Sequence, residues 1–232
     1  LVHQPISGLT EEIDGVFDTR VQMVDEQNSV VLASEFIPAA ERANMIKNVD
    51  RWVIGASLSF CVAKKPSLVF VRLSGDSVND HSLIGWLDAR LRSSSVDPAT
   101  ICFQVAENVA AQFLKQTKSI AEKLRSAGFR FAIDHVGLGR DPGQILSHIP
   151  MDYMKIDGSL MQGLHRNTEA QGKVSALTNA ARRLTIRPIA ERVEDANTMA
   201  ILWQLGVAYI QGNYIQMHGV VLEDTQTISG IV

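Results

Sequence analysis

Six short strand-like runs in this chain each end on polar or charged residues, the side-chain types that bind polar ligands. In a barrel of parallel strands such ends share one rim, where ligands bind. We therefore expect their carboxylates, amides and cations to lie around one site. The runs are FDTRVQM at 17–23, LVFVRLS at 68–74, ICFQVAE at 101–107, FRFAIDHV at 129–136, YMKID at 153–157 and RPIAERVE at 187–194.

Two other patterns argue against a zinc site and against a dinucleotide-binding fold. The six histidines show no HExxH or comparable spacing, so a zinc site is not expected, and His135 is interpreted as a hydrogen-bonding residue of the rim. GLGRDPG at 137–143 contains Pro142 and lacks a GxGxxG continuation, which argues against a dinucleotide fold. This segment is interpreted as a lid-like loop.

Helical patterns alternate with the strand-like runs, and this alternation predicts parallel strands covered by helices. Ser34 is a plausible N-cap for the first helix, and Gly128 and Gly206 are expected to end two later ones. The predicted helices cover 34–45, 48–63, 82–92, 116–128, 169–184 and 196–206, and a last unit covers 207–215. The first segment, LVHQPISGL, is joined by the turn-like TEEIDG to FDTRVQMV, so these two could form an antiparallel pair that opens the barrel.

Composition limits the possible classes of protein. With 232 residues, 46% hydrophobic and 20% charged, the chain can bury one core of α/β barrel size. Its net charge of −3 excludes a basic surface for long nucleic acids, but a few placed cations could still bind a small nucleotide. No apolar stretch is long enough for a membrane span. Cys61 and Cys102 lie in apolar runs without CxxC spacing, which predicts reduced core thiols and a cytoplasmic protein.

Seven short sequence motifs resemble, in order, the conserved motifs of the EAL-domain family of cyclic di-GMP phosphodiesterases. The resemblance covers essentially the whole chain. It implies a (β/α)8 TIM-type barrel with an antiparallel first strand. Because the chain opens directly into a strand-like segment, we expect residues 1–232 to be one domain, the C-terminal module, of a larger signalling protein. The motifs are QPI at 4–6, SEFIPAAE at 34–41, VDRWV at 49–53, AIDHVGLG at 132–139, MKIDGS at 154–159, AERVE at 190–194 and YIQG at 209–212.

The resemblance also implies that an active member hydrolyses cyclic di-GMP with divalent metals held by carboxylates and an Asn at strand ends. Such metals prefer hard oxygen ligands. In this chain the signature Glu-Ala-Leu falls on residues 18–20, Asp18-Thr19-Arg20, and the Asn falls on Arg72. The next Glu falls on Gln104, and the paired aspartates fall on Asp134 and His135.

Other positions match the family. Lys155, Glu191 and Gln211 are the expected residue types, whereas Arg192 replaces a Gly and Gln22 replaces the phosphate-contacting Arg. Because a guanidinium is always protonated and offers donors only, it repels a divalent ion but suits a phosphate oxygen. We therefore expect no bound metal.

The expected ligand contacts leave several alternatives open. Either Arg20 replaces the missing phosphate contact or Arg72 makes it alone. Phe17 could stack on guanine or belong to the core, and Asp50 could accept from a guanine edge or be an exposed helix carboxylate. Lys155 and Asp157 could instead form a structural ion pair. The complete set of expected ligand-binding residues is Gln4, Phe17, Arg20, Asp50, Arg72, Asp134, Lys155, Asp157, Glu191 and Gln211.

The resulting hypothesis is a catalytically inactive domain that binds cyclic di-GMP as its ligand, without a cofactor, and relays it to a protein partner. MKIDGSLMQGL at 154–164 and LWQLGVAYIQGNYIQ at 202–216 resemble a receptor that regulates twitching motility. That resemblance implies a PilZ-domain adaptor of the type IV pilus machinery as a partner. A weakly active metal-dependent phosphodiesterase and a scaffold that has lost the nucleotide are the alternatives.

Overall fold

The computed structural model describes residues 1–139 and 142–213, and one sheet of nine strands forms the centre of this part of the chain. The strands are β1 (Val2–Pro5), β2 (Ser7–Gly8), β3 (Val16–Arg20), β6 (Leu68–Arg72), β7 (Ile101–Ala106), β8 (Arg130–Val136), β9 (Tyr153–Ile156), β10 (Arg187–Ala190) and β11 (Tyr209–Ile210). Their order is β1-β3-β6-β7-β8-β9-β10-β11-β2, and all neighbours from β3 to β11 pair in parallel.

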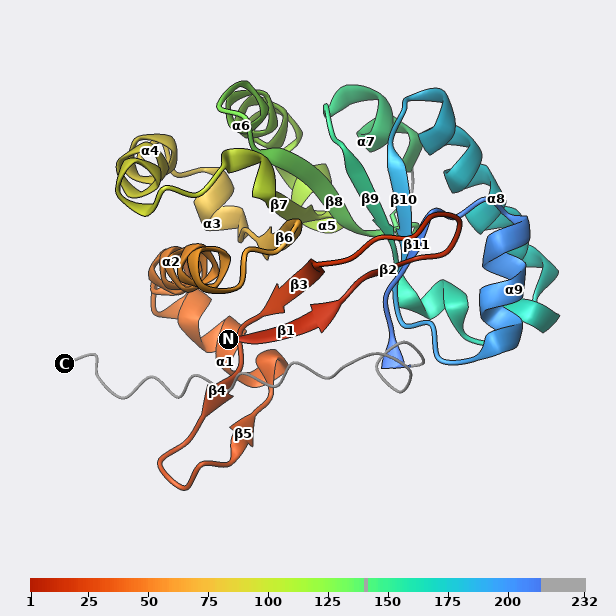
Figure 1. The fold of residues 1–232 in the computed structure, drawn as a ribbon, viewed down its shortest axis with the longest axis horizontal. Helices are drawn as coiled ribbons and strands as arrows, with labels where there is room; N and C mark the ends of the chain where they lie inside the picture. The colour runs from red at the N-terminus through yellow and green to blue at the C-terminus, as the bar shows by residue number, and fades with distance from the viewer. Residues whose placement is uncertain (140–141, 214–232) are drawn as a thin grey trace.

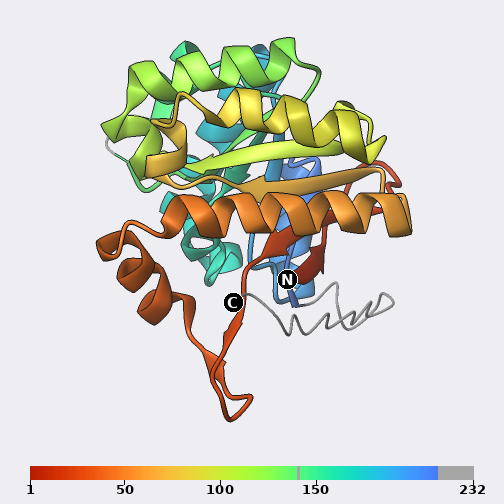
Figure 2. The same ribbon diagram turned by 90° about the vertical axis from the view of Figure 1, so that its left-hand side faces the viewer.

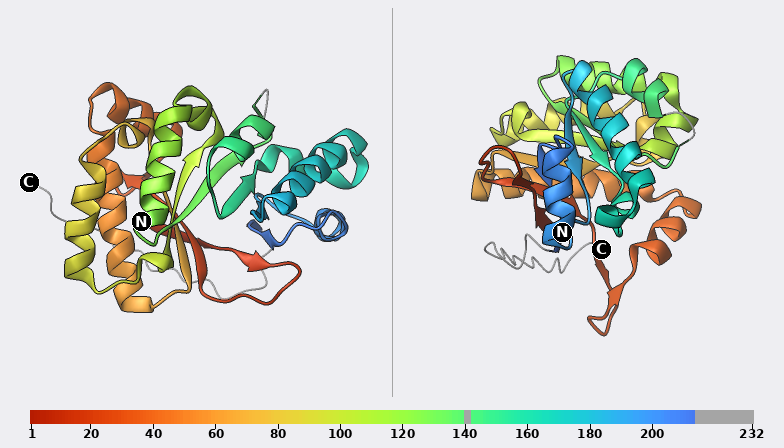
Figure 3. Two further views of the ribbon diagram at one scale, coloured as in Figure 1. Left: turned by 90° about the horizontal axis from the view of Figure 1, so that it is seen from above. Right: turned by 90° about the vertical axis from the view of Figure 1, so that its right-hand side faces the viewer.

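The first extended segment closes the barrel. β1 pairs antiparallel with β3, and β2, which follows after Ile6, pairs antiparallel with β11. Counting β1 and β2 as one interrupted strand gives eight strands, so the predicted (β/α)8-type barrel with an antiparallel first strand is confirmed. Figure 3 shows this red segment running from the side of the orange helices to the side of the blue C-terminal elements.

Helices cover the outside of the barrel (Figure 1). They are α1 (Ala33–Arg42), α2 (Ile46–Lys64), α3 (Gly75–Val78), α4 (Leu83–Ser94), α5 (Glu107–Gln112), α6 (Leu114–Ser126), α7 (Pro142–His148), α8 (Thr168–Arg183) and α9 (Ala196–Gln204). Short 3-10 helices lie at Pro98–Thr100, Gly158–Met161 and Leu164–Arg166. A hairpin of β4 (Met23–Val24) and β5 (Val30–Val31) projects from the barrel together with α1 (Figure 2).

Helix α6 shows why these sequences form covering helices. Its buried residues, Thr117, Ile120, Ala121 and Leu124, recur at the spacing of one helix face, and apart from the half-buried Leu114 the rest of the helix is charged or polar. Gly128 follows with a φ of 93°, the left-handed conformation that ends a helix. Strands enclosed by such helices are buried on both faces, and the first four residues of β6 are accordingly buried apolar residues.

Some predicted boundaries differ from the structure. Ser34 is not an N-cap, because α1 begins at Ala33 after the extended residue Leu32. The run predicted at 17–23 is interrupted after Arg20, and its last residue, Met23, already belongs to the hairpin. Gly206, with a φ of 75°, follows the end of α9 as expected. Tyr214 and Ile215 of the last predicted unit, and Arg140 and Asp141 of the predicted loop, lie outside the described residues.

The two cysteines agree with a further expectation. Cys61 and Cys102 are free and buried, and burial raises the pKa of the Cys61 thiol to about 12. Such thiols are inert at neutral pH. None of the helices in the described ranges is long and apolar enough to cross a membrane.

Candidate functional site

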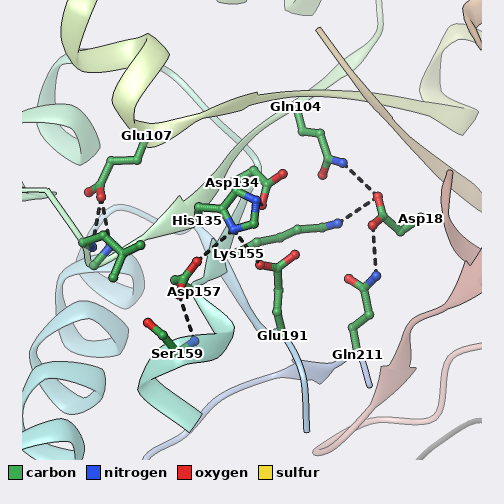
Figure 4. Close-up of polar contacts among 12 residues, drawn as sticks. Asp18, Gln104, Glu107, Asp134, His135, Lys155, Asp157, Ser159, Glu191 and Gln211 are labelled. Carbon is green, nitrogen blue, oxygen red and sulfur yellow. Dashed lines mark hydrogen bonds and ion pairs between the residues drawn. The ribbon is translucent and has the colours of Figure 1, made fainter. Parts of the chain in front are cut away.

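Polar side chains at the ends of the parallel strands meet at the carboxyl-terminal end of the barrel, and Asp18 on β3 is the centre of one half of this cluster (Figure 4). The Gln104 amide donates to Asp18 Oδ1 at 2.8 Å, and the Gln211 amide donates to Asp18 Oδ2 at 2.9 Å. Lys155 Nζ lies 2.9 Å from Asp18 Oδ1, and Gln211 also donates to Gln4 Oε1 at 2.8 Å. Both oxygens of Asp18 are therefore already occupied by protein donors.

These donors keep Asp18 ionised. Burial alone would raise the pKa of Asp18, but the Lys155 ammonium, the Gln211 amide and the more distant Arg20 guanidinium together lower it to about 2. Lys155 is completely buried, with its ammonium 4.8 Å from the centroid of the Phe70 ring. The positive charge of Lys155 is thus paired inside the barrel and is not exposed to a ligand above the rim.

The other half of the cluster surrounds Asp134 on β8. The Arg72 guanidinium at the end of β6 forms an ion pair with Asp134 Oδ2, and its Nη2 lies 3.1 Å from His135 Nε2. Asp134 is fully buried, whereas about half of the Arg72 side chain (49%) is exposed. Arg72 can therefore contact a ligand at the rim and still neutralise the carboxylate beneath it.

His135 lies between carboxylates because β8 is irregular at this point. The pairing of β8 with β9 shifts between Ile133 and Val136, and His135 has a left-handed φ of 56°. Such bulges re-aim side chains next to binding sites. His135 Nδ1 lies 2.9 Å from Asp157 Oδ2 and 3.3 Å from Glu191 Oε2. The Glu191 hydrogen bond, opposed by burial but supported by the charge of Asp134, raises the pKa of His135.

Three buried oxygens of the cluster have no hydrogen-bond donor among the described residues. They are Asp134 Oδ1, Gln104 Oε1 and Gln211 Oε1. The amide orientations follow from Asp18, because each Gln presents its nitrogen to that carboxylate and so turns its oxygen elsewhere. Since buried acceptors normally have donors, this end of the barrel suits a ligand or water that brings N–H or O–H groups.

One contact beside the cluster was not predicted from the sequence. Glu107, at the start of α5, is buried, and its Oε2 accepts from the backbone nitrogens of Gly137, Leu138 and Gly139 at 3.2, 3.1 and 2.7 Å. A carboxylate with three backbone donors fixes the beginning of the loop after β8. The only signal was the acidic residue that ends the 101–107 run, and its partners lie 30 to 32 positions away.

Two predicted ligand-binding residues are not brought to this cluster. Phe17 lies next to Asp18 in β3 and therefore faces the other side, where its ring meets Phe60 of α2 edge-on with centroids 5.6 Å apart. Asp50 on α2 is buried, and its Oδ2 accepts from Ser74 N at 2.8 Å. Burial raises the pKa of Asp50, opposed by the serine hydrogen bonds. The other eight predicted residues, including the exposed Arg20 and the N-capping Asp157, lie in the two halves of the cluster.

Asp134, His135 and Glu191 have the geometry of a possible cation site, since one ligand atom of each lies within 4.8 Å of the others. Arg72, however, contacts two of these three side chains. The fixed positive charge of a guanidinium opposes a divalent ion at this position. In this arrangement the Arg72 guanidinium lies beside the ligand atoms that a divalent ion would need.

Comparison with known proteins gives a family match over most of the chain. The family model described as EAL domain matches residues 1–218. Cyclic di-GMP phosphodiesterase PdeB of Shewanella oneidensis is 28% identical over 222 residues, covering 91% of this chain and 25% of PdeB. Cyclic di-GMP phosphodiesterase PdeF of Escherichia coli is 27% identical over 219 residues, covering 93% of this chain and 29% of PdeF. The chain thus spans about a quarter of the length of these curated relatives.

Solved structures include similar barrels. The EAL domain of FimX from Pseudomonas aeruginosa, determined bound to c-di-GMP, is 31% identical with a TM-score of 0.88, covering 93% of this chain and 88% of that one. The FimX EAL domain of Xanthomonas citri, in complex with c-diGMP, is 21% identical with a TM-score of 0.85, covering 93% of this chain and 86% of that one. At that identity the second comparison supports the fold alone.

Proposed function

This chain belongs to the EAL domain family, and on that premise we propose that it binds cyclic di-GMP as a receptor and does not hydrolyse it. The observation that carries the proposal is the ion pair of Arg72 with Asp134, which puts a fixed cation where the family resemblance implies a metal ligand. The c-di-GMP complex of the 31% identical FimX EAL domain supports the choice of ligand.

In this proposal the exposed cations hold the phosphates. Arg72 and Arg20 have side chains that are 49% and 54% exposed, and both lie next to buried carboxylates that keep them in place. Charge-assisted hydrogen bonds from a guanidinium to phosphate are among the strongest polar contacts in proteins. The unpartnered oxygens of Gln104, Gln211 and Asp134 would accept from ribose hydroxyls, base N–H groups or bound water.

The same contacts argue against hydrolysis. A carboxylate with a pKa of about 2, such as Asp18, is too weak a base to activate water at neutral pH. Lys155 is buried against Asp18, and Arg72 opposes the divalent ions that the family's reaction requires. In this proposal the residues that bind the nucleotide are retained, and the residues that would hydrolyse it are not.

Titration calorimetry with cyclic di-GMP, first in EDTA and then with added Mn²⁺, tests the proposal. We expect the same affinity in both buffers, and chromatography of the mixture should show intact cyclic nucleotide. Linear product formed with Mn²⁺ or Mg²⁺ at a rate above that of a Glu191→Gln variant would contradict it. That result would favour a weakly active phosphodiesterase, for which the Asp134, His135 and Glu191 group is the supporting observation.

We further propose that the bound state is relayed to a protein partner. The support is the similarity to FimX together with the stretches at 154–164 and 202–216, and a PilZ-domain adaptor is the first candidate. Co-purification of such an adaptor with the chain, with and without cyclic di-GMP, tests this. Equal capture in both conditions would contradict a relay, and capture in neither would remove the adaptor as the partner.

A further inference from the structure

The amino-terminal end of the barrel, opposite the polar cluster, contains a cavity of about 280 Å³. Phe70, Tyr153 and Tyr209 supply aromatic walls, with Phe70 and Tyr153 edge-on at 5.2 Å between centroids and Tyr153 and Tyr209 tilted at 6.3 Å. Ile6 and Ile189 add aliphatic surface. A cavity of this size and lining suits the apolar body of a small molecule.

This cavity lies directly beneath the polar cluster. Side chains two positions apart in a strand share a face, so an inward-facing residue of the cavity lies one layer below an inward-facing residue of the rim. Five strands follow this rule, with the pairs Val16 and Asp18, Phe70 and Arg72, Tyr153 and Lys155, Ile189 and Glu191, and Tyr209 and Gln211. The cavity and the rim are separate sites, and the Phe70 ring lies between them beneath Lys155.

Two charged side chains of opposite sign line the cavity, Asp14 and Arg187. The Arg187 guanidinium lies 6.0 Å from the centroid of Tyr153 and donates a hydrogen bond to the Tyr153 hydroxyl, and among the described residues no carboxylate is within 4.0 Å of it. Glu11 lies beyond that distance and accepts from the Tyr209 hydroxyl. Asp14 Oδ1 accepts from Gly15 N at 2.7 Å, which leaves its second oxygen for another donor.

We propose that this cavity is a second ligand site, for a free amino acid with an aromatic or branched apolar side chain. The apolar side chain would fill the space between Phe70, Tyr153 and Tyr209, the carboxylate would pair with Arg187, and the ammonium would pair with Asp14. A simple carboxylate would leave Asp14 facing a like charge, and a simple amine would do the same for Arg187. A zwitterion carries a partner for each of these two charges, which neither a simple carboxylate nor a simple amine does, and the inference does not depend on the nucleotide proposal.

Calorimetry and ligand-observed NMR with three probes test this site. L-Phenylalanine carries both charges, 3-phenylpropionate lacks the ammonium, and 2-phenylethylamine lacks the carboxylate. We expect L-phenylalanine to bind several-fold more tightly than either analogue. Arg187→Gln and Asp14→Asn should each weaken its binding by roughly ten-fold, the size of one charge-assisted hydrogen bond.

Both variants change exposed side chains, so the fold should be retained, and a melting curve for each checks this. Arg183→Gln, which alters an exposed arginine of α8 outside the cavity, is the matched control and should bind like the wild type. Ile13→Trp, at the cavity wall, should abolish binding. The proposal is overturned if L-phenylalanine does not bind, if the analogues bind as tightly, or if Arg187→Gln leaves its affinity unchanged.

Discussion

In the proposed function, Arg72 is the residue that favours a phosphate over a divalent ion at the rim. Its charge is permanent, its side chain is half exposed, and its partner Asp134 is fully buried. Gln104, on the neighbouring strand and in register with Arg72, is neutral and buried and already donates to Asp18. Substitutions at these two positions therefore compare the loss of a charged contact with the loss of a neutral contact at the same level of the barrel.

We predict that Arg72→Ala weakens cyclic di-GMP binding more than Gln104→Ala does. A charge-assisted contact contributes roughly 1.5 to 3 kcal/mol, against about 1 for a neutral hydrogen bond, so the affinities should differ several-fold. Calorimetry on both variants measures this, with Arg183→Gln as a control for loss of one exposed arginine. Equal losses from the two substitutions would mean that Arg72 does not touch the ligand.

Asp18 predicts a dependence of stability on pH. Its pKa of about 2 in the folded protein lies below the ordinary value of about 3.9, so its contribution is complete above pH 4 and is lost as the pH falls through 2. That contribution is about 2 to 3 kcal/mol. Urea unfolding at pH 6, 4 and 3 should show that the wild type exceeds Asp18→Asn in free energy of unfolding, and that this difference becomes smaller at the lowest pH. A constant difference between the two would contradict the pairing with Lys155.

At the scale of elements, the role of Phe17 follows from the alternation of side chains along β3. The ring packs on Phe60 of α2, on the face opposite Asp18. We therefore expect Phe17→Ala to lower the free energy of unfolding by about 1 to 3 kcal/mol, less than a fully buried Phe, because the ring is half-buried. Cyclic di-GMP affinity of the folded protein should stay within about two-fold. A large loss of affinity with unchanged stability would support guanine stacking.

The elements also explain which contacts the sequence could predict. Strand ends in a barrel share a rim, so the grouping of Asp18, Arg72, Lys155 and Glu191 follows from the alternation of strands and helices alone. Phe17 is predicted from its position just before Asp18, and Asp50 is predicted from the family resemblance of VDRWV at 49–53. Whether a helix carboxylate faces the rim or, like Asp50, caps a neighbouring loop depends on how the helix is rotated against the barrel, which local sequence does not determine.

The hairpin of β4 and β5 could not be predicted from the sequence. Its strands have two residues each, too few for an alternating pattern. The irregular pairing of β8 at His135 was also missed, because a bulge adds a residue without changing composition. Family resemblance named the residues of this segment, but only the backbone shows that Asp134 and His135 point to different partners.

At the scale of the whole molecule, closure of the barrel depends on the short segment that contains β1 and β2. Ile6 is buried at the point where β1 passes into β2, and β2 contributes only two residues to its pairing with β11. We predict that Ile6→Ala lowers the free energy of unfolding by about 2 to 5 kcal/mol. Val2→Ala, in the same segment but 42% exposed, should change it by less than about 1 kcal/mol. Denaturant titrations measure both, and equal effects would mean that Ile6 does not anchor the closing segment.

The closing segment also sets the order in which the sheet can be completed during synthesis. Gly8 and Tyr209 pair across 201 positions of the sequence, so β2 leaves the ribosome long before its partner exists. At about 5 to 20 residues per second, this interval is roughly 10 to 40 seconds. Until Ile210 emerges, the nascent sheet keeps an unpaired edge, which is the feature that promotes aggregation. Chaperone capture of nascent chains should accordingly end when β11 has left the exit tunnel.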